Sequence, residues 1–291
     1  MKNLRCLLKK QLWDYLLQGL THRLGRSPIC PCCGGLKSTQ VDRKYFHTLH
    51  ECRGCGILFR FPSETPVEMN NFYQAGYDEP GLTTELPSEE ELARLIASNF
   101  SGSAKDYHYH VDIFRALGLG PGAKILDYGA NWGYATYQFR KARFDATGFE
   151  LSRPRAEFGK RLGLEILTTL PSKAETYDAV YSCQVLEHVP NPEATLWEQL
   201  RLVRPGGLVI AHTPNGSEAA RHADPKAFHH LWGKVHPVLL TDQFILRRFG
   251  GLTHYISSDD RPSVLRMWSK EKSQIGALDR TGLFIVLVKQ K

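Results

Sequence analysis

The chain has 291 residues, more than one average domain, so its length predicts a main domain with an appendage. Hydrophobic residues make up 42% and charged residues 23%, which excludes a largely disordered chain. No uncharged apolar run approaches the roughly 18 residues that a membrane-spanning helix requires. Residues 1–28 carry six basic side chains and one acid, which accounts for +5 of the net charge of +7 and leaves +2 for the remainder. Because that remainder is nearly neutral, we expect no nucleic-acid partner.

Residues 1–27 are predicted to form a basic amphipathic helix. Leu4, Leu8, Leu12 and Leu16 recur at helical spacing, and most of the charged side chains lie elsewhere on the helical wheel. Such a helix binds a membrane surface peripherally, or packs on the protein body or on a second subunit as in a homodimer; we favour packing on protein. Lysines interrupt any signal-peptide core in this region, so we expect a cytoplasmic protein.

Residues 28–62 are predicted to form a zinc ribbon. Four of the seven cysteines fall in the pairs CPCC and CRGC, which give Cys30 with Cys33 and Cys52 with Cys55. Two such pairs separated by 18 residues can complete a tetrahedral thiolate shell around a structural Zn²⁺ ion. Two disulfides are the alternative, but a reducing compartment favours zinc. Cys32 is expected not to be a ligand.

The ribbon is expected to contain a strand from Lys44 to His50 and another from Ile57 to Phe61. Residues 63–100 are rich in proline, glycine and acids over most of their length, which is typical of a connector. It is expected to end in a helix over residues 88–97.

Residues 101–291 show the alternation of helices and strands that predicts an α/β domain. Helices are expected over about 106–117, from about Tyr134, after Ser152, after Asn191 and over 241–249. Strands are expected at 124–129, 144–150, 164–167, 178–182, 207–212, 252–257 and 283–289. Crossover connections of this length imply parallel strands.

A candidate ligand site follows the first two strands of this domain. DYGANWG places Asp127, Gly129 and Gly133 between the first strand and the following helix, where backbone can approach a ligand closely. Glu150 ends the next strand, where an acid can accept both hydroxyls of a ribose. The segment matches neither a dinucleotide fingerprint nor a phosphate-binding loop.

Together, ILDYGANWGYAT, the acid in GFELS, and YDAVYSCQVLEHVPNPEATLWEQLRLVRPGGLVIAHTPN resemble the class I S-adenosylmethionine-dependent methyltransferases. The cysteine pairs and the following LFRFPSETPVEMNNFYQAGYDE resemble the zinc-ribbon appendage of some small-molecule members. The resemblance implies a Rossmann-like, seven-stranded, mostly parallel sheet with helices on both faces. It also implies cofactor contacts from Asp127, Gly129, Asn131, Gly133, Glu150, Leu151, Cys183 and Gln184. Asn131 stands where the family usually has glycine.

The resemblance leaves the methyl acceptor open. We expect a small metabolite, a sugar or a lipid-linked biosynthetic intermediate. The alternatives are an RNA methyltransferase that binds its substrate through the ribbon and a catalytically silent scaffold with the same fold. The sequence does not separate O-, N- and C-methylation.

Histidines crowd the segments after the fourth and fifth strands of this domain, and an imidazole can take a proton from an acceptor. His236 is the preferred general base, and His188 is the rival, since its LEHV turn also suits a structural or cofactor-lid role. A covalent role for Cys183 is not favoured, because the proline expected before a nucleophilic cysteine is missing. A second metal site is not expected, because no His-x-x-x-His spacing is present.

Overall fold

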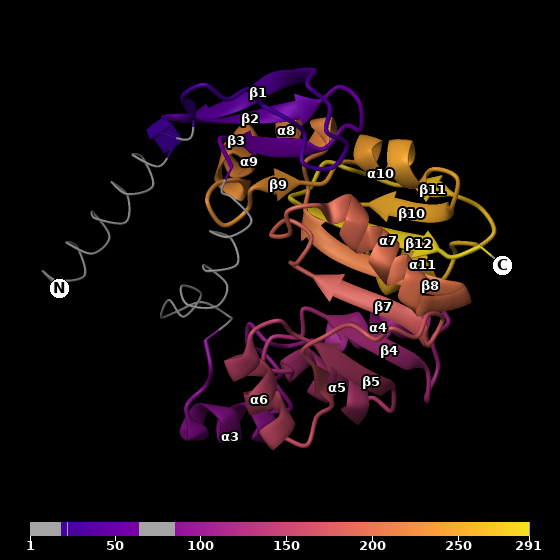
Figure 1. Ribbon diagram of the computed structural model, residues 1–291. Helices are drawn as coiled ribbons and strands as arrows, with labels where there is room; N and C mark the ends of the chain where they lie inside the picture. The colour runs from indigo at the N-terminus through magenta and orange to yellow at the C-terminus, as the bar shows by residue number, and fades with distance from the viewer. Residues whose placement is uncertain (1–18, 22, 64–84, 291) are drawn as a thin grey trace, which may run out of the picture.

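The computed structural model describes residues 19–21, 23–63 and 85–290, and its central feature is a sheet of eight strands (Figure 1). The strand order is β11-β10-β12-β8-β7-β4-β5-β6. The strands are β4 (Lys124–Tyr128), β5 (Asp145–Phe149), β6 (Ile166–Leu167), β7 (Tyr177–Cys183), β8 (Val203–Pro214), β10 (Thr253–Ser257), β11 (Gln274–Ile275) and β12 (Gly282–Val288). Strands β4 to β8 pair in parallel, whereas β12 runs antiparallel to β8 and β10. The predicted Rossmann-like sheet is therefore confirmed, and the two-residue β11 adds a strand to the expected seven.

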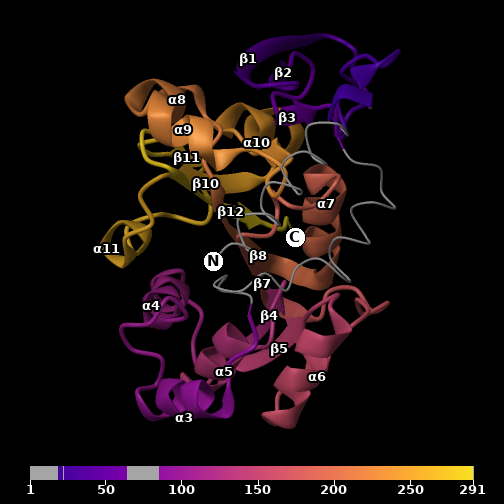
Figure 2. The ribbon, with the colours of Figure 1, turned by 90° about the vertical axis from the view of Figure 1, so that its left-hand side faces the viewer.

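Helices cover both faces of this sheet, as predicted. Tyr181 of β7 packs in one apolar cluster with Phe114 of α4 (His108–Ala116), whereas the adjacent Val180 packs in another with Leu196 of α7 (Pro192–Leu202). Figure 2 shows α4 and α7 on opposite sides of the sheet. The other helices are α3 (Glu89–Ala97), α5 (Tyr134–Lys141), α6 (Arg153–Arg161), α8 (Glu218–Ala223), α9 (Pro225–Leu231), α10 (Asp242–Phe249) and α11 (Pro262–Leu265). Because successive side chains of a strand point to opposite faces, a sheet covered on both sides has almost continuously apolar strands.

Polar caps fix where the helices begin. The Asn191 side chain accepts a hydrogen bond from the Ala194 N–H (3.0 Å) at the start of α7, where Pro192 occupies the first turn. Thr241 caps α10 in the same way, through the N–H of Phe244 (2.9 Å). These caps set the ends of the loops that leave the sheet at its C-terminal edge.

A second sheet contains the ribbon strands β1 (Ser38–Lys44), β2 (His47–Cys52) and β3 (Leu58–Phe61), with β9 (Val238–Leu239) as its fourth strand. Leu58 of β3 pairs with Leu239 of β9 in antiparallel register. Figure 1 shows the ribbon, in indigo, beside α8, α9 and α10. A segment that follows α9 thus completes the ribbon sheet, so the ribbon is joined to the larger sheet's loops by backbone hydrogen bonds.

The predicted single strand from Lys44 to His50 is wrong. The structure places a hairpin turn at Tyr45 and Phe46, between β1 and β2, and Tyr45 adopts a positive φ of 52°. Turns of this kind usually contain Gly or Asn, so two aromatic residues gave no signal of it. Most of the predicted helix over 1–27 and of the connector over 63–100 lies outside the described residues.

Within the described parts of the chain, every helix is too short or too polar to cross a lipid bilayer.

Candidate active site

The four predicted zinc ligands form one group of thiols. The Sγ atoms of Cys30, Cys33, Cys52 and Cys55 lie within 4.8 Å of one another. The Cys30–Cys55 and Cys33–Cys52 Sγ distances are both 3.5 Å, far longer than a disulfide bond of about 2.05 Å. Zn–S bonds of about 2.3 Å in a tetrahedron place sulfur atoms about 3.8 Å apart, so this thiol group fits a structural Zn²⁺. Cys32 lies outside this group, as expected.

The loop after β4 closely approaches its neighbours and requires glycine at two positions. Gly129 has a φ of 86°, and a Cβ there would lie 2.5 Å from the Val185 side chain. Gly133 has a φ of 88° and begins α5. Asn131 also adopts a positive φ, of 54°, which is less costly for asparagine than for most other side chains. Side chains larger than hydrogen at the two glycines would therefore displace their neighbours or strain the loop.

Two carboxylates flank this loop. Asp127 is buried at the end of β4 and accepts a hydrogen bond from the Thr136 hydroxyl (2.7 Å), and burial raises its pKa to about 7. Glu150 accepts hydrogen bonds from the N–H groups of Asn131 (2.9 Å) and Ser152 (2.7 Å), while burial raises its pKa. A carboxylate offers about four acceptor positions, so these two hydrogen bonds do not use all of them.

Three further predicted cofactor contacts lie at the ends of β5 and β7. Leu151 follows Glu150 and is 60% exposed. The Gln184 N–H donates to the carbonyl of His212 (2.9 Å) and holds the backbone after β7 against β8. The Cys183 thiol interacts electrostatically with both Asp127 and Glu187, and burial raises its pKa to about 11. A thiol that stays protonated at neutral pH is a poor nucleophile.

The two histidines predicted as rival bases lie together with an acid. His188 follows β7 and His236 precedes β9, and their ring centroids are 4.7 Å apart. Glu187 is fully buried, its Oε2 accepts from the Thr213 hydroxyl (3.1 Å), and its Oε1 lies 3.8 Å from His188 Nε2. We call Glu187, His188 and His236 the Glu187 cluster.

Burial favours the neutral form of every member of the Glu187 cluster. It raises the pKa of Glu187 to about 8, lowers that of His188 to about 4 and lowers that of His236. Sequence reasoning missed Glu187, although its position next to His188 was the available signal.

The remaining histidines lie elsewhere. His212 of β8 packs against His110 of α4, with 5.0 Å between the ring centroids. The Tyr181 ring contacts both of these histidines, and the Tyr107 ring stacks on His110. Burial lowers the pKa of both of these histidines to about 3. His212 belongs to the strand face that α4 covers, so it does not join the Glu187 cluster. Neither Tyr107 nor His110 was predicted as a site residue.

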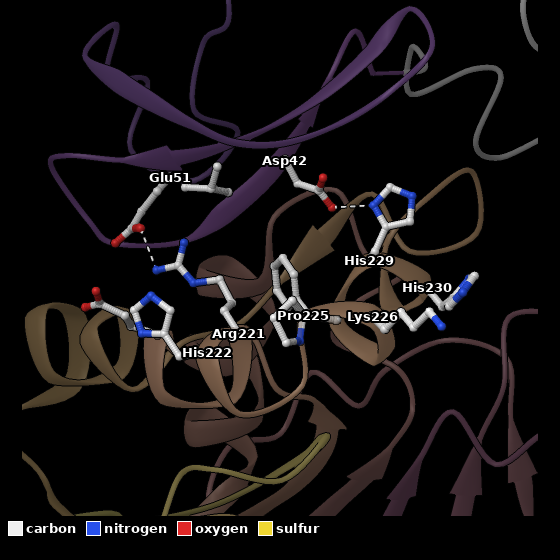
Figure 3. A pocket seen from close by; sticks show the side chains of 11 residues that line it. Asp42, Glu51, Arg221, His222, Pro225, Lys226, His229 and His230 are labelled. Carbon is white, nitrogen blue, oxygen red and sulfur yellow. Dashed lines mark hydrogen bonds and ion pairs between the residues drawn. The ribbon is translucent and has the colours of Figure 1, made fainter.

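A cavity of about 750 Å³ lies between the ribbon and helices α8 and α9 (Figure 3). An ion pair from Arg221 to Glu51 (2.9 Å) and a hydrogen bond between His229 Nδ1 and Asp42 Oδ2 (2.8 Å) span it. His222, Lys226 and His230 also line it. Polar and charged side chains from both sides meet here, which indicates a polar junction between the ribbon and the segment after β8.

Comparison with known proteins gives matches to methyltransferases. A family model described as a methyltransferase domain matches residues 91–245. The chain is 28% identical over 173 residues to the ubiquinone biosynthesis O-methyltransferase of Methylococcus capsulatus, covering 56% of this chain and 65% of the relative. It is 27% identical over 170 residues to the protein of the same name from Alkalilimnicola ehrlichii, covering 55% of this chain and 63% of the relative. The chain thus spans slightly less than two thirds of these relatives.

Among solved structures, the plantazolicin methyltransferase BpumL in complex with a pentazolic desmethylPZN analog and SAH aligns with a TM-score of 0.49 at 15% identity. That alignment covers 68% of this chain and 91% of BpumL.

Proposed function

Because this chain belongs to the methyltransferase domain family, as a class I S-adenosylmethionine-dependent methyltransferase, we propose that it methylates a hydroxyl group of a small molecule. The observation that carries the proposal is the Glu187 cluster. It brings His236 beside Glu187 and His188, which follow β7, the strand that pairs with the glycine loop's strand β4. The names of the O-methyltransferase relatives support a hydroxyl acceptor.

The cofactor is proposed to lie over the glycine loop. Glu150 has acceptor positions for the ribose hydroxyls, and Asp127 can stabilise the cationic methionine part. The backbone of Gly129, Asn131 and Gly133 would approach the cofactor directly, with Leu151, Cys183 and Gln184 around it. S-adenosylmethionine supplies a methyl group on a sulfonium, so the leaving group needs no activation by the protein.

His236 is proposed to accept the proton of the acceptor hydroxyl. Its Nδ1 lies 2.7 Å from the carbonyl oxygen of Leu231, so that nitrogen carries the hydrogen and Nε2 carries the lone pair. In-line methyl transfer requires an aligned, deprotonated oxygen, which a base held in this way can supply.

The function is tested by product mass. The zinc-loaded protein is incubated with S-adenosylmethionine labelled in its methyl group and with a fractionated metabolite extract, and we expect the label in a small molecule. Label found only in RNA or protein would contradict the proposal.

Variants of the Glu187 cluster separate the two histidines. We expect His236→Ala to lower turnover by about 10²–10⁴ while leaving the S-adenosylmethionine affinity nearly unchanged, because the loss falls on the proton acceptor. His222→Ala, in the cavity at the ribbon, is the matched control and should keep wild-type turnover. If His236→Ala retains full turnover and His188→Ala abolishes it with cofactor binding intact, the two roles are exchanged.

A further inference from the structure

The Glu187 cluster unites three potential metal ligands from two distant segments. Glu187 and His188 lie in the turn after β7, whereas His236 lies between α9 and β9. One ligand atom from each side chain lies within 4.8 Å of the others. Among the described residues, this is the one group of three or more such ligands apart from the ribbon thiols.

Backbone carbonyls fix the tautomer of both imidazoles. His188 Nδ1 lies 2.7 Å from the carbonyl oxygen of Val235, and His236 Nδ1 lies 2.7 Å from that of Leu231. A carbonyl oxygen only accepts hydrogen bonds, so each Nδ1 carries the hydrogen and each Nε2 presents a lone pair. Metal-binding histidines are held in just this way by a second shell of acceptors.

The carboxyl group of Glu187 has one oxygen committed and one available. Oε2 accepts a hydrogen bond from Thr213, whereas Oε1 is buried without a hydrogen bond from any described residue. Leaving a buried polar oxygen unsatisfied costs free energy. A ligand that bonds to Oε1 removes this cost.

We propose that Glu187, His188 and His236 bind a divalent transition-metal ion, of the class of Zn²⁺ or Mn²⁺. Two neutral imidazoles and one carboxylate suit such ions, whereas Ca²⁺ and Mg²⁺ prefer shells composed of oxygen ligands. Three protein ligands leave at least one coordination position open, as in catalytic rather than structural sites.

The role of this ion rests on the proposed function. The acceptor's oxygen would occupy the open coordination position of the ion, which would favour the deprotonated form of that oxygen. The hydroxyl proton passes to solvent, the oxygen forms a bond to the methyl carbon, and the bond from that carbon to the sulfonium sulfur breaks to leave a neutral thioether. The ion and the proton compete for the lone pair of His236 Nε2, so the ion replaces His236 as the means of deprotonation when it is bound.

The site is tested by equilibrium binding without cofactor or acceptor. Protein whose ribbon holds one zinc per chain is titrated with Co²⁺, and binding is followed by the visible absorption of the ion and by elemental analysis. We expect one Co²⁺ per chain in addition to the ribbon zinc. Glu187→Gln and His236→Asn should each weaken its binding at least about tenfold, and His222→Ala should bind as the wild type does.

The outcomes are distinct. Failure to bind Co²⁺ beyond the ribbon, or equal binding by wild type, Glu187→Gln and His236→Asn, overturns the site. His236→Asn alters a half-buried loop residue and keeps the test valid if Glu187→Gln fails to fold. If the protein binds Co²⁺ but methylates no small molecule, the proposed function is overturned and the metal site is supported. If the protein methylates a small molecule but binds no Co²⁺, the metal site is overturned and the proposed function is supported.

Discussion

Asp127 is a buried acid, and its burial disfavours the negatively charged form of its carboxyl group. A cationic cofactor would favour that charged form. Burial raises its folded-state pKa to about 7, above the value of about 3.9 expected in the unfolded chain. The folded state therefore binds the proton more tightly, and this stabilising contribution is complete below about pH 4 and is lost as the pH rises to about 7.

Replacing Asp127 by asparagine should therefore stabilise the cofactor-free protein at high pH. We expect Asp127→Asn to raise the free energy of unfolding relative to wild type by roughly 1–3 kcal/mol more at pH 8 than at pH 5, because asparagine avoids the cost of a buried charge. Urea unfolding at both pH values measures the difference. An effect of equal size at both values would show that burial does not govern this group.

Sequence reasoning predicted some site residues better than others. Asp127 and Glu150 end neighbouring parallel strands, and this geometry follows from the alternation of strands and helices. Glu187 lies next to the predicted His188, but its contact with the segment that carries His236 joins parts of the chain that are far apart in the sequence. The spacing of residues along the chain gives no signal of such a contact.

At the scale of elements, hydrogen bonds join the ribbon to residues 232–241, the segment that carries His236 and β9. The Arg60 N–H donates to the carbonyl of Pro237 (2.8 Å), next to His236, and the Thr241 hydroxyl donates to the carbonyl of Gly56 (2.8 Å). The zinc-binding turns and His236 are thus separated by a single strand pair, β3 with β9.

Loss of the zinc ligands should therefore lower turnover more than it lowers the affinity for S-adenosylmethionine. We expect Cys52→Ser to remove the ribbon zinc and to lower turnover, because metal binding stabilises the ribbon that β9 joins. The S-adenosylmethionine affinity should change by no more than roughly threefold, since the glycine loop connects β4 with α5 and so belongs to the larger sheet and not to the ribbon sheet. Elemental analysis, calorimetry and turnover measure the three quantities, with Cys32→Ser as the control; wild-type turnover in zinc-free Cys52→Ser would contradict this coupling.

The elements themselves were predictable where they are long. Strands β4, β5, β7, β10 and β12 and the capped helix α7 lie within a few residues of their expected positions. The two-residue strands β9 and β11 carry no periodicity, because their pairing is imposed by the strands beside them. Helices α8 and α9 were also missed, and they line the cavity against the ribbon.

At the scale of the whole molecule, the candidate site lies at the carboxyl ends of the parallel strands. Parallel strands β4, β5 and β7 bring the glycine loop, Glu150 and the Glu187 cluster to their carboxyl ends. The ribbon pairs with β9, which directly follows the segment that carries His236. The central claim is that this edge binds S-adenosylmethionine, with the ribose on Glu150.

Calorimetric titration of S-adenosylmethionine into the zinc-loaded protein tests this claim most directly. We predict one molecule bound per chain, and Glu150→Ala should weaken binding by about 1.5–3 kcal/mol, because hydrogen bonds to a charged acceptor are lost. Glu157→Ala, which removes an exposed acid from α6, is the matched control and should bind as the wild type does. No binding to the wild type, or wild-type affinity in a folded Glu150→Ala protein, would contradict the account.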